Sequence, residues 1–198
     1  MFFKKKDARP KKVLIVSGLP RSGTSLMMMM LDAAGIPPMQ DNIREADADN
    51  PKGYYEFERV KKLPDGDNKW VGDAKGKAVK VITMLLEHLP SNYHYDVIMM
   101  RRELGEILAS QRKMLERRGE DPNKVSDKEM GELFEKHFNQ VMIWLKKQKN
   151  MQFIEVSYNQ LLENPNEEID RVNQFLGGEL DVAAMHATID PKLYRQRN

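Results

Sequence analysis

The sequence contains no cysteine, which excludes disulfide bonds, thiolate metal sites and a cysteine nucleophile. It also lacks any apolar run approaching the roughly 20 residues that span a bilayer. The basic start, MFFKKKDARPKK, has no apolar stretch of the kind that marks a signal peptide. Because 32 basic and 30 acidic side chains leave a net charge of only +2, no global charge favours nucleic acid or a membrane surface. We therefore expect a soluble cytoplasmic protein in which any anion site is local.

Short apolar runs alternate with helical patterns along the chain. We predict parallel strands over residues 12–17, 78–82, 95–100 and 152–156, the first of them buried. Helices are predicted over 24–34, 84–88, 103–117, from a Ser126/Glu129 capping box onward, and after Asn164-Pro165. Strands that alternate with helices predict an α/β fold, a mostly parallel sheet with helices on both faces in three layers.

Two of these helices carry apolar residues in patterns that predict which side is buried. Four consecutive methionines, Met27 to Met30, point all ways around a helix, so we expect this helix to be buried on most sides. The stripe expected on the helix after Ser126 consists of Met130, Leu133, Phe134, His137, Val141 and Leu145. With 40% hydrophobic residues in 198, we expect a single domain over residues 1–198, of which 1–10 form a flexible basic N-terminus.

The strongest functional signal is GLPRSGTS, a glycine-rich turn between the first strand and the first helix. Gly18 and Gly23 have the spacing of a P-loop, but the lysine normally found after the second glycine is absent. Amides of residues 22–25 at a helix N-terminus are expected to bind an anion, with Arg21 supplying positive charge and the Ser25 hydroxyl a hydrogen bond. The fold prediction is therefore a P-loop-type domain.

The missing lysine bears on the choice of nucleotide. A kinase of this fold also needs an acid at the end of a neighbouring strand to hold magnesium. Here the best strand, YDVIMM, ends in Arg101 and Arg102. Two cations at this position favour an anionic donor that requires no metal.

On these residues the chain resembles the sulfotransferases that use 3′-phosphoadenosine-5′-phosphosulfate (PAPS), in particular the bacterial branch and the tyrosylprotein sulfotransferases. Their loop is similar to GLPRSGTSLMMMMLDA. The resemblance implies that the loop binds the 5′ phosphosulfate of PAPS. The residues with this implied role are Arg21, Ser22, Gly23, Thr24 and Ser25.

Two further motifs follow in the order of that family. A strand ends in Arg102, and Ser110 follows eight residues later on the next helix, which implies that both bind the 3′ phosphate. The stretch VSYNQLLENPNEEIDRVNQFLG places Tyr158 where the family has a tyrosine near the adenine. The chain departs from the family where VKVIT keeps Lys80 without the usual histidine. The basic glycine loop over the 3′ phosphate is not evident either, and only Lys192, Arg195 and Arg197 could substitute for it.

The resemblance implies a sulfuryl transfer from PAPS to a hydroxyl or amine of a small-molecule, glycan or peptide acceptor, with adenosine 3′,5′-bisphosphate as product and no metal. Arg21 and the loop amides are expected to stabilise the transferring group, and Lys80 to assist the bridging oxygen. Either Asp41 or Glu56 is expected to act as the base, with Glu56 preferred because it lies beside two tyrosines.

Two other functions remain open from the sequence. An ATP-dependent small-molecule kinase would share the loop and the fold. A non-catalytic nucleotide-binding module is compatible with the short chain and the missing histidine.

Overall fold

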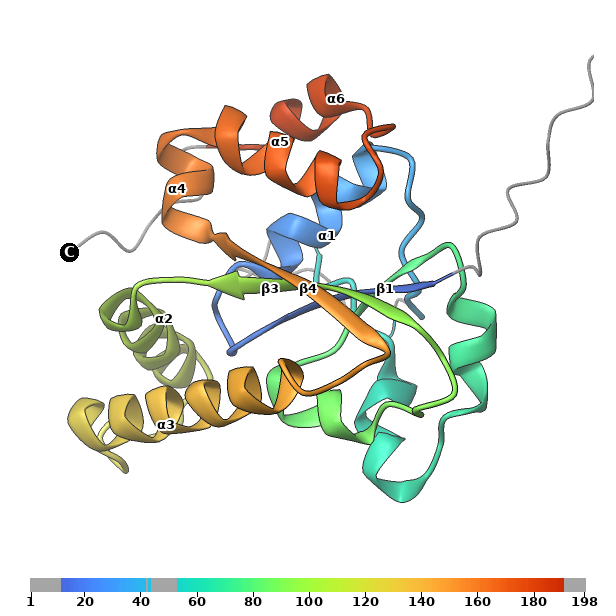
Figure 1. Ribbon diagram of the computed structural model, residues 1–198. Coiled ribbons are helices and arrows are strands. Elements are labelled where there is room, and N and C mark those ends of the chain that lie inside the picture. Colours follow the sequence, from blue (N-terminus) through green and yellow to red (C-terminus); the bar gives the residue numbers. More distant parts are fainter. Residues whose placement is uncertain (1–11, 42, 44–52, 191–198) are drawn as a thin grey trace, which may run out of the picture.

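The computed structural model describes residues 12–41, 43 and 53–190. Its centre is a four-stranded sheet in the order β2-β1-β3-β4, in which every neighbouring pair is parallel (Figure 1). The strands are β1 (Val13–Gly18), β2 (Ala78–Lys80), β3 (Tyr95–Arg101) and β4 (Met151–Ser157). All four predicted strands are confirmed, although β2 ends two residues earlier than expected.

Helices cover both faces of this sheet, so the predicted three-layer α/β architecture is confirmed (Figure 1). One face is covered by α1 (Thr24–Ala33), α4 (Tyr158–Glu163), α5 (Pro165–Phe175) and α6 (Val182–Ala187). The other face is covered by the 3-10 helices η1 (Glu58–Asp65), η2 (Lys69–Ala74) and η3 (Thr83–His88), together with α2 (Leu104–Arg117) and α3 (Asp127–Leu145). The sequence patterns did not predict η1, η2, α4 or α6.

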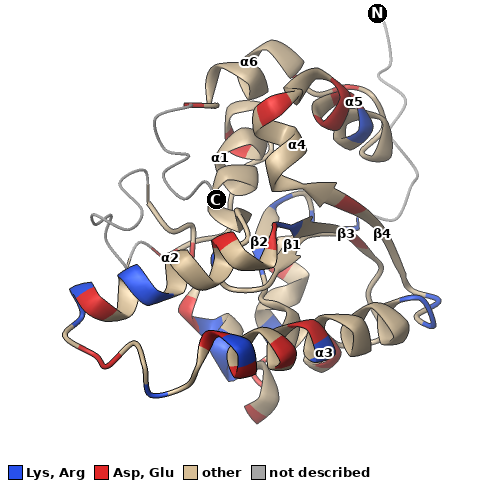
Figure 2. Cartoon of the chain, turned by 90° about the vertical axis from the view of Figure 1, so that its left-hand side faces the viewer, with Lys and Arg blue, Asp and Glu red and all other residues tan. Residues whose placement is uncertain are grey.

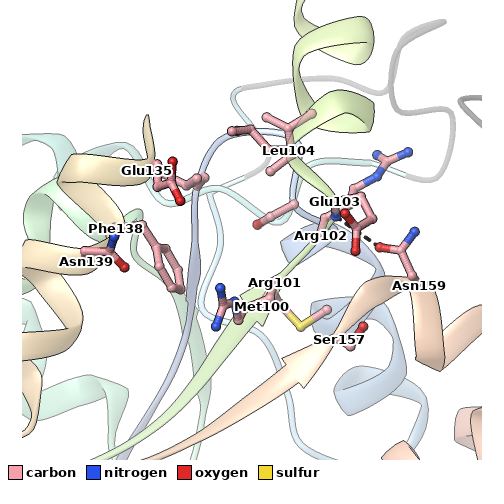
Figure 3. Close-up of a pocket in the computed structure, with 13 residues that line it drawn as sticks. Met100, Arg101, Arg102, Glu103, Leu104, Glu135, Phe138, Asn139, Ser157 and Asn159 are labelled. Atoms are coloured by element: carbon pink, nitrogen blue, oxygen red, sulfur yellow. Dashed lines mark hydrogen bonds between the residues drawn. The ribbon is translucent and has the colours of Figure 1, made fainter. Parts of the chain in front are cut away.

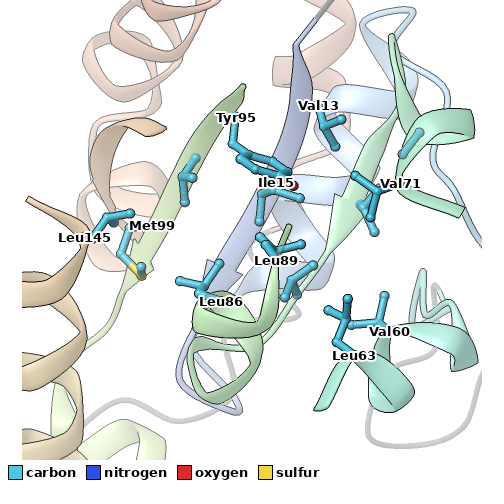
Figure 4. Close-up of a cluster of buried hydrophobic side chains, with 14 of the residues drawn as sticks. Val13, Ile15, Val60, Leu63, Val71, Leu86, Leu89, Tyr95, Met99 and Leu145 are labelled. Atoms are coloured by element: carbon cyan, nitrogen blue, oxygen red, sulfur yellow. The ribbon is translucent and has the colours of Figure 1, made fainter. Parts of the chain in front are cut away.

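Two apolar clusters hold the layers together, one on each side of the sheet. Val13 and Ile15 of β1 belong to the cluster under η1–η3 and α3, which Figure 4 shows. Leu14 and Val16 point the opposite way, into the cluster that contains α1. Because both faces of β1 are covered, a continuous apolar run was needed rather than an alternating one. Three of the four consecutive methionines of α1 are fully buried, as the sequence predicts.

The residues that the long helix α3 buries differ from its predicted stripe. Ser126 caps the helix as expected, since its Oγ accepts a hydrogen bond from the amide of Glu129 at 3.2 Å. Leu133, however, is 54% exposed, and the buried residues are Gly131, Phe138, Met142 and Leu145. The face that packs on the sheet is therefore rotated relative to the predicted one, because the apolar residues of this helix occupy more than one side of it.

Three further predictions concern the two ends of the chain, membrane-spanning helices and the distribution of charge. The predicted flexible segment 1–10 and the basic residues Lys192, Arg195 and Arg197 lie outside the described residues. Among the helices that the structure describes, none is long and apolar enough to cross a membrane. Basic and acidic residues are interspersed over α2 and α3 (Figure 2), which agrees with the small net charge.

Candidate functional site

The turn after β1 presents backbone amides at the N-terminus of α1. The amide of Ser22 donates to the carbonyl oxygen of Leu19 at 3.2 Å and closes the turn, so it is used inside the loop rather than available for an anion as predicted. Arg21 (φ 68°) and Gly23 (φ 96°) both adopt left-handed backbone conformations that turn the chain into the helix. The amides that α1 leaves without intrahelical partners are those at its first turn, and they create a local positive end.

Gly23 is also fixed by packing. A Cβ atom at this position would lie 2.3 Å from Cδ2 of Tyr158, at the start of α4, so no side chain fits between the loop and that ring. Tyr158 is itself buried, and burial raises the pKa of its phenol, although the charges of Arg102 and Arg21 oppose the rise. The phenol is therefore neutral at physiological pH and does not repel an anion.

Ser22 contributes a hydroxyl that suits a phosphate or sulfate group. The side chain is buried, and its Oγ has no hydrogen-bond partner in the described part of the chain. A Cβ on Gly18 would lie only 2.3 Å from this oxygen, so the first glycine of the loop leaves room for it. A buried hydroxyl without a partner is unfavourable by roughly 1–3 kcal/mol, and an oxyanion in the loop would relieve this.

The end of β3 brings a second cation to the loop. Arg102 Nη1 donates to the carbonyl oxygen of Arg21 at 3.1 Å, and its Nε donates to Glu106 at 2.8 Å. The guanidinium carbon lies 4.5 Å from the centre of the Tyr158 ring. Arg102 thus ties together the loop, the start of α2 and the start of α4.

Arg21 and Ser110 meet directly. Arg21 Nε donates to Ser110 Oγ at 2.9 Å, and Ser110 is buried on the inner side of α2. The connection between β3 and α2 consists of only two residues, Arg102 and Glu103, and this short link lets the arginine at the strand end and a serine two helical turns later converge on one region. Arg21, Arg102, Ser110 and Tyr158 therefore form one cluster.

Lys80 lies on the other side of the loop, at the end of β2. Its Nζ donates to the carbonyl oxygen of Tyr54 and lies 3.3 Å from Ser25 Oγ and 3.7 Å from the Glu56 carboxylate. The Lys80 side chain is only 8% exposed. The backbone at Tyr55 is left-handed (φ 52°), which aims the Tyr54 carbonyl and the Glu56 side chain at the same ammonium group.

The two candidate bases have different surroundings. Asp41 Oδ2 accepts a hydrogen bond from the amide of Glu58 at 2.7 Å, and its Oδ1 accepts one from the amide of Ile43 at 3.2 Å. Asp41 therefore holds the backbone that leads into η1. Glu56 instead directs its carboxylate toward Lys80 at the loop and toward Lys61 at 3.8 Å.

A cavity of about 380 Å³ opens beside the cluster, between the loop and the ends of β3 and β4 (Figure 3). Ser22 of the loop and Arg102 of the cluster both line this cavity. Arg101 points away from Arg102, lies over the ring of Phe138 at 5.0 Å and pairs with Glu155 at 2.9 Å. The two consecutive arginines thus serve opposite faces of the sheet.

The sequence profile described as "Sulfotransferase domain" matches residues 10–192 of this chain. The chain belongs to the sulfotransferase family. Two solved structures share the fold of this sulfotransferase. The sulfotransferase domain from the Synechococcus PCC 7002 olefin synthase has a TM-score of 0.51 and 15% identity, and the match covers 100% of this chain and 88% of that one. Among curated protein sequences, none matches.

The second structure is mouse sulfotransferase SULT7A1 complexed with PAP, with a TM-score of 0.50 and 21% identity. The match covers 92% of this sulfotransferase but only 63% of the mouse chain. At these identities the likeness concerns the fold, and the assignment of residues rests on the geometry described above.

Sequence reasoning missed two residues of this sulfotransferase's cluster, Glu106 and Asn159. Glu106 is buried and pairs with Arg102, and Asn159 Nδ2 donates to its other carboxylate oxygen at 3.0 Å. A signal was present for Glu106, because it lies four residues before Ser110 on the predicted helix 103–117 and so shares one face of that helix with it. No comparable pattern marks Asn159, which reaches Glu106 only through the tertiary structure.

Proposed function

We propose that this sulfotransferase moves a sulfuryl group from PAPS to a hydroxyl or amine of an acceptor. The observation that carries the proposal is the cluster of Arg21, Arg102 and Ser110 beside a helix N-terminus. The loop at this N-terminus contains a buried Ser22 hydroxyl that has no hydrogen-bond partner among the described residues. PAPS supplies the sulfuryl group and leaves as adenosine 3′,5′-bisphosphate. The fold is shared with a mouse sulfotransferase whose structure contains PAP, which supports testing this nucleotide first.

The sheet order separates the roles of the two sides of the loop. Because β1 lies between β2 and β3, Lys80 and Arg102 flank the loop from opposite sides. We assign the 3′ phosphate of the donor to the side of Arg102 and Ser110, and the 5′ phosphosulfate to the loop residues Ser22, Gly23, Thr24 and Ser25. The acceptor then approaches from the side of β2, where Lys80 lies.

Arg21 takes part in donor binding in this arrangement. Its Nε is directed to Ser110, on the 3′-phosphate side, rather than toward Lys80. Lys80 and Ser25 are the side chains placed to stabilise charge on the transferring group, because both already converge on a single oxygen, the carbonyl of Tyr54. The Tyr54 carbonyl oxygen, which carries partial negative charge, lies between these two hydrogen-bond donors, as an oxygen of the transferring group would.

We assign the general base to Glu56. Its carboxylate lies 3.7 Å from Lys80 Nζ, next to the loop, whereas both oxygens of Asp41 accept hydrogen bonds from backbone amides. Moving a proton to Asp41 would weaken those hydrogen bonds. Asp41 is therefore assigned a structural role, that of fixing the segment that carries Glu56.

The test is calorimetric titration of the purified protein with adenosine 3′,5′-bisphosphate, beside ATP with and without magnesium. We expect metal-independent binding of the bisphosphate. In Arg102→Lys it should weaken by about tenfold or more, since the fork is lost and a hydrogen bond to a charged group contributes about 1.5–3 kcal/mol. Arg118→Lys, at the exposed end of α2, serves as the matched control and should bind like the wild type.

Two other outcomes would each replace the proposal. Magnesium-dependent binding of ATP with no binding of the bisphosphate would make the chain a kinase. Tight bisphosphate binding without sulfuryl transfer to any phenol, sugar or peptide acceptor in a screen would indicate a non-catalytic nucleotide-binding module.

A further inference from the structure

We propose that Glu106 and Asn159 are positioning residues that hold Arg102 ready for the 3′ phosphate of the donor. The inference rests on the proposed function, because it concerns the same nucleotide site. It assigns to these two residues a role that acts through the guanidinium of Arg102. The chain of contacts runs from the backbone amide of Glu103, just before α2, through Asn159 and Glu106 to Arg102.

The guanidinium of Arg102 is held at three points. Nε donates to Glu106 at 2.8 Å, Nη1 donates to the Arg21 carbonyl at 3.1 Å, and the plane lies over Tyr158 at 4.5 Å. The remaining nitrogen, Nη2, makes no hydrogen bond with any residue that the structure describes. One edge of the guanidinium is thus fixed by the protein, and the donors left over are directed by that fixation toward an incoming anion.

The ion pair between Arg102 and Glu106 is buried, unlike the exposed ion pairs that contribute little to stability. The side chains of Arg102 and Glu106 are 8% and 5% exposed, so solvent screens the pair weakly. A buried carboxylate beside an anion site opposes anion binding through its charge. Its retention there is explained if it contributes more by orienting Arg102 than it loses by repulsion.

Asn159 fixes Glu106 in turn. Its Nδ2 donates to Glu106 Oε1 at 3.0 Å, while its Oδ1 accepts from the amide of Glu103 at 3.1 Å. Glu103 immediately precedes α2, and Asn159 follows Tyr158 in α4. One amide side chain therefore links the element that carries Tyr158 to the element that carries Ser110, and Figure 3 shows it facing Glu103 across the edge of the cavity.

The experiment measures how strongly the protein prefers adenosine 3′,5′-bisphosphate to adenosine 5′-monophosphate, by calorimetric titration of both nucleotides. Wild type should prefer the bisphosphate. In Glu106→Ala this preference should fall by about tenfold or more, with affinity for the monophosphate unchanged within about twofold, because only the contact to the 3′ phosphate is disturbed. Glu106→Gln should restore part of the preference, since its amide oxygen still accepts from Arg102 Nε.

A second variant tests the same chain of contacts without removing a buried charge. Asn159→Asp keeps the hydrogen bond from the Glu103 amide but places a second carboxylate against Glu106. It should lose the preference for the bisphosphate as Glu106→Ala does. Glu116→Ala, an exposed glutamate on the same helix, is the matched control and should keep the wild-type preference.

Each outcome decides the inference. If the wild-type protein shows no preference for the bisphosphate, the proposed function fails and the inference fails with it. If the wild type prefers the bisphosphate but folded Glu106→Ala and Asn159→Asp retain that preference, the inference alone is overturned. Should Glu106→Ala not fold, Asn159→Asp decides, because Asn159 is only partly buried and its substitution leaves no cavity.

Discussion

Replacing Gly23 with alanine tests the architecture of the loop most directly. The new Cβ would lie 2.3 Å from Cδ2 of Tyr158, and the backbone at Gly23 is left-handed (φ 96°). The left-handed conformation disfavours alanine by about 1–2 kcal/mol, and forcing a buried ring to move adds about 1–3 kcal/mol. We therefore expect Gly23→Ala to lower the free energy of unfolding by about 2–5 kcal/mol.

Gly35, just past the other end of α1, provides the control. It has a nearly identical backbone (φ 91°), but a Cβ there would meet nothing within 4 Å. Gly35→Ala should therefore lose only the conformational term, about 1–2 kcal/mol. The difference between the two variants isolates the contact with Tyr158.

Urea unfolding followed by circular dichroism measures both free energies under the same conditions. A second measurement connects the result to function. Because Tyr158 lies under the guanidinium of Arg102, its displacement in Gly23→Ala should also weaken binding of adenosine 3′,5′-bisphosphate, whereas Gly35→Ala should bind normally. Equal destabilisation in the two variants would refute the argument, since the packing of the loop against Tyr158 would then contribute nothing.

Three further predictions address the base, the core and the pH dependence. Glu56→Gln should reduce the turnover number by at least about tenfold, or about 1.4 kcal/mol, with unchanged donor affinity, whereas Asp41→Asn should mainly lower the melting temperature. If Asp41→Asn instead lost turnover and Glu56→Gln lost stability, the two roles would be exchanged. Met142→Ala should lower the free energy of unfolding by about 2–5 kcal/mol in urea titrations, because Met142 is buried, while Leu133→Ala should change it by less than about 0.5 kcal/mol. Similar losses in the two variants would mean that α3 buries a different face. Burial raises the pKa of Tyr95, so the stabilisation from its neutral phenol is complete below about pH 10, where the unfolded phenol begins to ionise, and is lost as pH rises further. Urea midpoints above about pH 10 should therefore fall less steeply in Tyr95→Phe than in the wild type, and parallel curves would contradict this.

Local sequence was sufficient for the elements whose burial is nearly complete. The run VLIVSG became β1 because both faces of a central parallel strand are covered, and only apolar residues satisfy both. The four methionines of α1 were predictable for the same reason. The glycine spacing of the loop also indicated an anion site, since positive φ values and close approach depend on residue type.

The buried faces of helices α2 and α3 were less predictable from the sequence. Leu133 belongs to an apolar series on α3, yet it is exposed, because the helix has apolar residues on several sides and packing against η3 and the sheet selects one of them. Helix α2 shows the opposite case, in which polar Glu106 and Ser110 are buried in preference to leucines. Hydrophobic periodicity alone predicts neither outcome.

The sequence by itself determined the α/β class, the loop and the residue types brought to it, because these depend on short-range periodicity and on glycine and arginine at fixed spacings. Only the tertiary structure decided that Arg21 meets Ser110, that Asn159 supports Glu106, and that Asp41 holds backbone while Glu56 faces Lys80. These contacts join residues between 17 and 89 positions apart. Their partners are chosen by sheet order and helix packing, which no local pattern encodes.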